Sequence, residues 1–314
     1  MIDNEIKTAI KTLKDGGVIG IPTETVYGLA ADIYNKKGIE NIFKTKERPF
    51  FDPLIVHISE ISQLPKLTKE WTKSHEKLAN FFWPGPLTFI VKKSENISDM
   101  ITSGLDTVGI RMPDHPKTLE LLNELGSPIA APSANKFKMI SPTSAEHVQA
   151  EFPEIQVIDG GDCKVGIEST ILKIEENKVI IFRPGMITPK MIKNVLGDNM
   201  IIEFHESEVA PGHLNHHYMP KKPIVFNVID LHEENDKLPE ELQVSLNSWD
   251  LPQDSTLAAR QLYGKFRELD QQKGPGIKIN LTTKQIEQDE FKGVINRLIK
   301  ASSYFLPKKF SNKA

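Results

Sequence analysis

Short apolar runs recur along the first two thirds of this sequence, and their spacing constrains the fold more than any other feature. We expect strands at 18–21, 54–58, 87–91, 107–111, 129–131, 156–158, 170–174 and 179–182. Apolar residues at helical spacing lie between them, at 6–13, 38–43, 76–82, 116–125 and 142–150. The last two strands are joined by 175–178, a connection of hairpin length. The pattern therefore predicts a mixed α/β sheet with flanking helices and excludes a simple Rossmann fold for this half.

The length of the chain predicts a second, smaller unit, because 314 residues exceed what one hydrophobic core commonly supports. The regular pattern fades near residue 200, and a run rich in proline, glycine and histidine follows. We expect a large domain at 1–200, a linker at 201–222 and a small domain at 223–314. In the small domain we expect strands and helices at 223–229, 256–270, 276–279 and 290–302. A unit of this size is near the lower limit of independent stability, so it should lean on the larger one.

Composition excludes several classes of protein. No apolar run approaches the roughly 18–20 residues that a membrane-spanning helix needs, and the acidic start of the chain does not resemble a secretory signal. We therefore expect a soluble, cytoplasmic protein. Cys163 is the single cysteine, so neither an intramolecular disulfide nor a multi-cysteine metal site can form. A formal net charge of -3 argues against a broad basic surface for nucleic acid, so a phosphate site must be sought locally.

Several predicted strands end in polar residues, where ligands gather in α/β sheets. The loop 22–29, which includes Thr25, follows the first strand and is either a ligand-binding loop or a capped turn into a helix. His57 ends an apolar run; it is either a satisfied core histidine or it orients a small substrate through its ring nitrogens. Arg111 ends another strand and needs an anion, which is either an internal carboxylate or a substrate carboxylate.

A pair of cations precedes Pro49. Proline biases the residue before it away from helical geometry, so we expect Lys46 and Arg48 on extended backbone, pointing the same way. Such a pair either converges on a triphosphate or belongs to a solvated charged face.

The small-residue strand end at 129–131 is followed by Ser133 and Asn135, whose side chains suit the close approach of a ligand. Ser141 stands directly before a proline, which predicts that it caps the next helix. The start of a helix nearby also favours an anion.

Two further polar groups, Ser169 and Arg183, lie at predicted strand edges. The sequence has neither a cysteine ligand set nor a histidine-glutamate metal motif. Together these strand-end residues favour a pocket for a polyanion and an amino acid over a metallohydrolase site.

These motifs, in this order, closely resemble the threonylcarbamoyl-AMP synthase family, which contains the YrdC domain. The resemblance covers roughly residues 5–198 and includes 22–29 (PTETVYGL), 46–49 (KERP), 53–57 (PLIVH), 83–88 (WPGPLT), 108–113 (VGIRMP), 131–135 (APSAN) and 169–171 (STI). The longer branch of the family adds a linker, which Pro211, Gly212, His217 and Tyr218 resemble, and a small C-terminal domain that looks shortened in this chain. The resemblance implies a YrdC-like twisted, open mixed sheet with a concave cleft, a linker over the active site, and a small Rossmann-like α/β domain.

The resemblance also implies an activity and a site. The enzyme would be a nucleotidyltransferase that forms threonylcarbamoyl-AMP and pyrophosphate from L-threonine, bicarbonate and ATP, for threonylcarbamoyladenosine modification of tRNA. L-threonine would be bound by Thr25, His57, Arg111, Ala131 and Ser169. ATP would be contacted by Lys46, Arg48, Asp52, Thr107, Ser133, Asn135, Ser141, Arg183 and Tyr218, with Lys46 and Arg48 as the catalytic cations.

Mg²⁺ would enter with ATP, and we expect no direct protein ligand to it. Asp52 stands where many relatives have asparagine, so a place beside ATP would require magnesium or a neighbouring cation to offset its charge. The product would pass to a threonylcarbamoyl transferase complex. The resemblance also implies that tRNA or double-stranded RNA is a possible partner of the chain.

Two alternatives belong to other classes. One is an RNA-binding module that recognises duplex RNA by shape, which a steep salt dependence without ATP turnover would reveal. The other is a carbamoyl-transfer domain of hydrogenase maturation, but that architecture includes zinc-finger segments, which a chain with one cysteine cannot supply.

Overall fold

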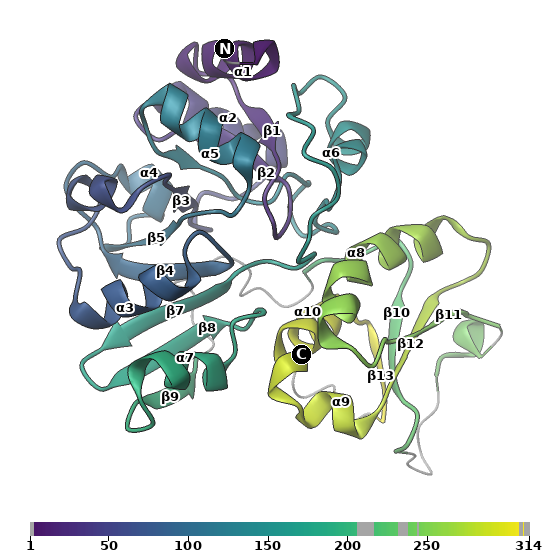
Figure 1. Ribbon diagram of the computed structural model, residues 1–314. Helices are drawn as coiled ribbons and strands as arrows, with labels where there is room; N and C mark the ends of the chain where they lie inside the picture. The colour runs from purple at the N-terminus through teal and green to yellow at the C-terminus, as the bar shows by residue number, and fades with distance from the viewer. Residues whose placement is uncertain (1–2, 206–216, 232–237, 244, 308–309, 311–314) are drawn as a thin grey trace.

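Two sheets organise the chain, and each carries its own helices (Figure 1). The computed structural model describes residues 3–205, 217–231, 238–243, 245–307 and 310. Most of the predicted linker, 206–216 with Pro211 and Gly212, lies outside the described residues. In the part of the chain that the structure describes, no helix is both long and apolar enough to cross a bilayer.

The larger sheet is mixed, as predicted, and its described strands run in the order β1-β2-β6-β3-β5-β4-β7-β8-β9. The β3–β5, β4–β7 and β8–β9 pairs are parallel, and the other neighbouring pairs are antiparallel. The strands are β1 Ile19–Ile21, β2 Gly28–Asp32, β3 Ile55–His57, β4 Leu87–Lys92, β5 Thr107–Arg111, β6 Ile129–Ala130, β7 Thr170–Glu175, β8 Lys178–Arg183 and β9 Ile201–Phe204. The parallel β3–β5 pair brings the ends of two strands, His57 and Arg111, side by side.

Helices pack on this sheet through apolar faces at helical spacing. The side chains of Ile6 and Leu13 are buried with Leu121 in one cluster, and a larger cluster holds Phe43 and Phe89. The helices are α1 Asn4–Lys14, α2 Lys36–Lys46, α3 Lys73–Phe82, α4 Asp99–Thr102, α5 Pro116–Leu125, α6 Ala145–Glu151 and α7 Pro189–Leu196, with a short 3-10 helix at Ile61–Lys66. Each predicted helix of this half is present, and its bounds differ from the prediction by a few residues.

Of the two alternatives for the loop 22–29, the capped turn into a helix is absent, because the loop turns back into β2 and Ile21 lies opposite Gly28. Two local expectations for this half were wrong. The helix predicted at 142 begins at Ala145, because Ser144 is the residue whose hydroxyl caps it. The residues Ile201–Phe204, expected in the linker, pair with β8 and extend the larger sheet beyond residue 200.

The smaller sheet is parallel throughout its described strands, in the order β11-β12-β10-β13, which agrees with the Rossmann-like expectation. The strands are β10 Ile224–Val228, β11 Asn247–Asp250, β12 Ile277–Leu281 and β13 Tyr304–Leu306. The helices are α8 Ser255–Gln271, α9 Thr283–Glu287 and α10 Lys292–Ala301, with 3-10 turns at Glu240–Leu242 and Asp289–Phe291. The short, polar β11 and the three-residue β13 were not predicted, because neither carries a long apolar run.

The core of the smaller domain continues into the larger one. Val26, Ile140 and Ile167 of the larger domain belong to the same buried cluster as Phe226 and Phe266. The small domain therefore packs against the larger one and shares its core with it, as its size predicts. Helix α10 of the smaller domain lies beside the start of β7 and the end of β8 (Figure 1).

Candidate active site

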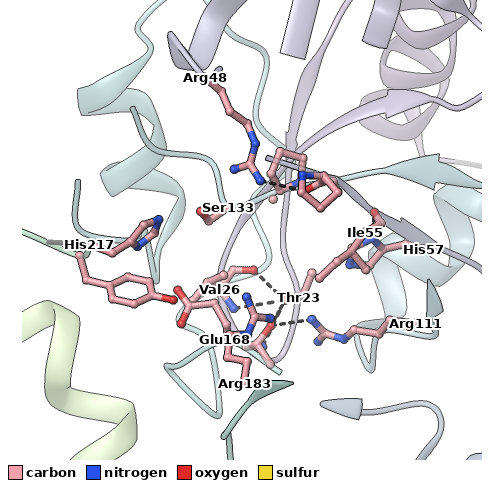
Figure 2. Close-up of a pocket in the computed structure, with 16 residues that line it drawn as sticks. Thr23, Val26, Arg48, Ile55, His57, Arg111, Ser133, Glu168, Arg183 and His217 are labelled. Atoms are coloured by element: carbon pink, nitrogen blue, oxygen red, sulfur yellow. Dashed lines mark hydrogen bonds between the residues drawn. The ribbon is translucent and has the colours of Figure 1, made fainter. Parts of the chain in front are cut away.

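A pocket opens where strand ends and loops of the larger sheet meet the residues 217–218. Figure 2 shows His57 and Arg111 on one side of it and His217 on the other, with Arg48 and Arg183 at its upper and lower edges in this view. The lining residues are Thr23, Thr25, Val26, Gly28, Arg48, Pro53, Ile55, His57, Arg111, Ala131, Pro132, Ser133, Glu168, Arg183, His217 and Tyr218. Eight of the residues predicted from sequence therefore line one pocket: Thr25, Arg48, His57, Arg111, Ala131, Ser133, Arg183 and Tyr218.

Arg111 finds its anion inside the protein. Its Nη2 lies 2.6 Å from Oε1 of Glu24, and both side chains are almost fully buried. The same guanidinium donates to Oγ1 of Thr25 at 2.9 Å and to the carbonyl of Gly85 at 3.2 Å. Of the two anions left open by the sequence, the internal carboxylate is therefore present, and it holds Arg111 against the Thr25 side of the pocket.

His57 is a neutral imidazole in this site. Burial, together with the nearby charge of Arg111, lowers its pKa to about 3, so the ring carries no charge near neutral pH. Its Nδ1 lies 3.2 Å from the carbonyl oxygen of Ile55. A neutral ring offers one donor and one acceptor, which suits the orientation of a small polar ligand.

Arg48 forms a cationic wall of the pocket and is held by its own loop. Its guanidinium donates to the carbonyls of Asp52 and Pro53 at 3.0 and 2.8 Å, and Nη2 lies 2.9 Å from Oδ1 of Asp52. Burial raises the pKa of Asp52, and the charge of Arg48 opposes that shift. Arg48 is thus the neighbouring cation that Asp52 was expected to need.

Lys46 lies on helical and not on extended backbone, so the expectation of a cation pair on extended backbone was wrong. Lys46 is the last residue of α2, because the left-handed Glu47, at φ 53, ends the helix after it. Its ammonium is buried and donates to the carbonyls of Ser133 and Asn135, each at 2.5 Å. Burial, followed by the charge of Arg48, lowers its pKa well below the usual value. Lys46 therefore holds the loop that presents Ser133 to the pocket.

Ser169 and Arg183 form a linked pair at the adjoining ends of β7 and β8. Arg183 donates from Nε to the carbonyl of Ser169 at 3.0 Å and from Nη2 to its hydroxyl at 3.1 Å. The Ser169 hydroxyl also lies 2.7 Å from that of Thr88. Ser169 does not itself line the pocket, but it fixes the arginine that does.

The residues 217–218 close the pocket from the linker side. Tyr218 adopts a left-handed backbone, at φ 64, and its ring is buried, with its centroid 4.1 Å from that of His217. Burial lowers the pKa of His217 to about 3, so this ring is also neutral near pH 7. Both residues line the pocket, while a linker that covers the active site stays a prediction.

Some predicted site residues lie outside the pocket. Asn135 donates from its side chain to the carbonyls of Lys136 and Met139, and the Ser141 hydroxyl donates to Glu168. Thr107 begins β5, four residues before Arg111, so strand geometry sets it about 13 Å from the pocket end. Five proposed ATP contacts remain predictions that the pocket lining does not support: Lys46, Asp52, Thr107, Asn135 and Ser141.

Sequence reasoning did not select Glu24, which stands inside the 22–29 motif, or Glu168, which directly precedes the 169–171 motif, and both are buried. A signal was available, because a glutamate next to binding-loop hydroxyls needs a cation, and Arg111 was known to need an anion. Among the described residues, no cluster of three histidine, cysteine or acidic side chains could hold a metal ion.

Comparison with known proteins finds relatives of both domains. A family model described as "Telomere recombination", which groups Sua5, YciO and YrdC proteins, matches residues 11–185, and one described as "Threonylcarbamoyl-AMP synthase, C-terminal domain" matches residues 187–303. The chain is 35% identical to the threonylcarbamoyl-AMP synthase of Pyrococcus abyssi, with 96% of this chain and 94% of that protein covered. It is 42% identical to the Bacillus subtilis threonylcarbamoyl-AMP synthase over 71% of this chain and 66% of that protein. The crystal structure of P. abyssi Sua5 complexed with L-threonine matches with a TM-score of 0.85 at 32% identity, covering 98% of this chain and 97% of that one.

Proposed function

Because this chain belongs to the threonylcarbamoyl-AMP synthase family, we propose that it makes threonylcarbamoyl-AMP and pyrophosphate from L-threonine, bicarbonate and ATP. The family resemblance read from the sequence motifs is thereby confirmed. The observation that carries the proposal is the division of one pocket. His57 and Arg111 lie on one side of it, and Arg48 and Arg183 lie at other edges (Figure 2). Thr25 also lines the pocket and accepts a hydrogen bond from Arg111. Such a pocket offers polar groups to an amino acid and cations to phosphates in the same space.

The reaction requires two bond-forming steps. The threonine nitrogen bonds to the carbon of bicarbonate and water leaves, which gives a carbamate. A carbamate oxygen then attacks the α-phosphorus of ATP, and pyrophosphate leaves. No covalent bond to the enzyme is needed, so the work of the protein is to align the two reactants and offset charge.

The threonine side of the pocket would orient the amino acid. Neutral His57 supplies a donor and an acceptor, and the Thr25 hydroxyl is fixed by its bond to Arg111. Since Glu24 offsets the charge of Arg111, this side is not strongly cationic and does not compete for the triphosphate.

The nucleotide side would offset the charge on the phosphates. Arg48 and Arg183 are both buried and both line the pocket, so their interactions with phosphate would be little weakened by solvent. Magnesium, bound to the phosphate oxygens of ATP, would supply further charge neutralisation. Buried His217 and Tyr218 would exclude water, which protects a carbamate that hydrolyses readily.

The experiment is to measure pyrophosphate release with ATP, magnesium and bicarbonate, with and without L-threonine. We expect threonine-dependent release that Arg48→Ala abolishes, because that variant removes a pocket cation. Lys44→Ala, which removes an exposed lysine of α2, is the matched control and should retain the activity of the unaltered protein. Release that does not depend on threonine would refute the proposal.

We further propose a cytoplasmic setting in which the adenylate passes to a transferase complex acting on tRNA. The buried free thiol of Cys163 is compatible with a reducing compartment. Direct contact with RNA is a separate question: a filter-binding assay with duplex RNA at increasing salt concentration would detect it as affinity that falls steeply with salt.

A further inference from the structure

The C-terminal domain reaches the pocket through one buried carboxylate, Glu168. This residue lines the pocket wall and belongs to the larger domain. Oε2 of Glu168 accepts from Nε of Arg297, in α10, at 2.9 Å and from the Tyr263 hydroxyl, in α8, at 2.9 Å. Oε1 accepts from the Ser141 hydroxyl at 2.6 Å. Groups from both domains therefore converge on a single side chain.

Glu168 is poorly suited to accept a proton in the reaction. Burial alone would raise its pKa, but the charges of Arg297 and Arg183 and the Ser141 hydrogen bond lower it to about 2. Both of its oxygens are already occupied by donors from Ser141, Tyr263 and Arg297. A weakly basic, fully hydrogen-bonded carboxylate at a pocket wall acts by holding its neighbours in place.

Arg297 extends this contact to the backbone on both sides of the Ser169–Arg183 pair. It donates from Nη2 to the carbonyl of Glu168, which precedes Ser169, at 3.1 Å. It also donates from Nη1 to the carbonyl of Pro184, which follows Arg183. The Arg297 side chain is fully buried, so one guanidinium bridges the two strand ends from behind the pocket.

The backbones of the two domains meet at the same place. A side-chain carbon at Gly293 of α10 would lie 2.9 Å from the backbone of Gly185, next to Pro184. A side-chain carbon at Gly166, two residues before Glu168, would lie 2.5 Å from Cα of Arg260 in α8. Glycine at these positions allows the contact that lets Arg297 and Tyr263 reach Glu168.

We propose that Arg297 and Tyr263 are positioning residues of the nucleotide site: by fixing Glu168 and Pro184, they set the position of the Arg183 guanidinium on the pocket wall. The inference rests on the proposed function for the identity of the ligand, since Arg183 is the group that would meet ATP. It assigns the C-terminal domain a role in nucleotide affinity although that domain lies behind the pocket wall.

The test uses Tyr263→Phe, which removes one hydroxyl and keeps the packed ring. Tyr304→Phe, at a half-buried tyrosine of β13 in the same domain, is the matched control. Two readouts are taken on the full chain: the Kd of ATP by calorimetry without threonine, and the KM values for ATP and threonine from pyrophosphate release. We expect Tyr263→Phe to weaken ATP binding and raise its KM by roughly 3- to 10-fold, with the threonine KM unchanged, because a hydrogen bond to a charged group is lost.

A double-mutant cycle separates positioning from general stability. Tyr263 and Ser141 act on the same carboxylate, so Tyr263→Phe should cost less ATP affinity in a Ser141→Ala background than alone. Equal costs in both backgrounds, or an ATP affinity no different from that of Tyr304→Phe, would overturn the inference. If the unaltered protein releases no pyrophosphate with threonine, the proposed function fails, while the calorimetric Kd of ATP still decides the positioning role.

Discussion

The buried Glu24–Arg111 pair offers the sharpest test of the electrostatics of this site. Glu24→Gln keeps the shape of the side chain and removes its charge. The change leaves a guanidinium that is 5% exposed without the carboxylate that lies 2.6 Å from it. The second carboxylate oxygen also accepts the backbone N–H of Asp114 at 3.0 Å, and this bond is lost in the variant if the single amide oxygen of glutamine faces Arg111.

Removal of one partner from a buried ion pair costs about 3–5 kcal/mol, because the remaining charge is buried without compensation. The glutamine oxygen can still accept from Arg111, so we expect a value near the lower end, about 3 kcal/mol. For a domain of this size, 1 kcal/mol lowers Tm by roughly 2–4 °C, which gives an expected decrease of roughly 6–12 °C.

The assay is thermal unfolding followed by circular dichroism, with Glu95→Gln as the matched control. Glu95 also lies 2.6 Å from its cation, Lys69, but its side chain is 89% exposed. Solvent screens an exposed pair, so Glu95→Gln should leave Tm almost unchanged. A similar Tm for the two variants would refute the argument that burial, and not distance, decides the strength of these pairs.

Three further predictions follow from burial and backbone contacts. The folded-state pKa of His57, about 3, lies below the unfolded value of about 6.5, so unfolding takes up a proton between these values and stability falls as the pH drops through 6.5. Denaturant titrations at pH 7.5 and pH 5 should show a loss of unfolding free energy that is about 2 kcal/mol smaller in His57→Gln than in the unaltered protein, because the other buried histidines contribute equally to both; equal losses would contradict it. Gly293→Ala should destabilise the contact between the domains by about 1–3 kcal/mol, because the added side-chain carbon meets the backbone of Gly185. Gly264→Ala in α8 is the control: it has open space around it and should be neutral or stabilising. Chemical denaturation of both variants checks this, and equal effects would refute it. Arg48→Lys keeps the charge but loses the guanidinium N–H groups that donate to the carbonyls of Asp52 and Pro53. We expect the free energy of unfolding to fall by about 1–3 kcal/mol and the KM for ATP to rise. An unaltered denaturation midpoint would show that these hydrogen bonds contribute little to stability.

Local sequence determined most of the secondary structure and part of the pocket. Apolar spacing located most strands and helices, because that signal depends on neighbours within a few positions. Polar residue types at strand ends and before Pro49 indicated six of the eight pocket residues, whereas Ala131 and Tyr218 came from the resemblance to the family. Where the local signal was ambiguous, the prediction failed. Ser141 and Ser144 are both good capping residues, and only the folded chain commits Ser141 to Glu168 and leaves Ser144 to cap the helix.

Tertiary structure decided which groups act together. Arg111 needed an anion and Lys46 needed acceptors, but only the sheet order brings Thr25 and its neighbour Glu24 to Arg111, across 86 residues from Thr25. The link from Arg297 to Glu168 spans 129 residues and two domains. A charged residue that is expected to be buried reveals that it needs a partner of opposite charge or a hydrogen-bonding partner, since its desolvation is costly without one. Which partner fills the requirement depends on the path of the backbone, and that path is a property of the whole fold.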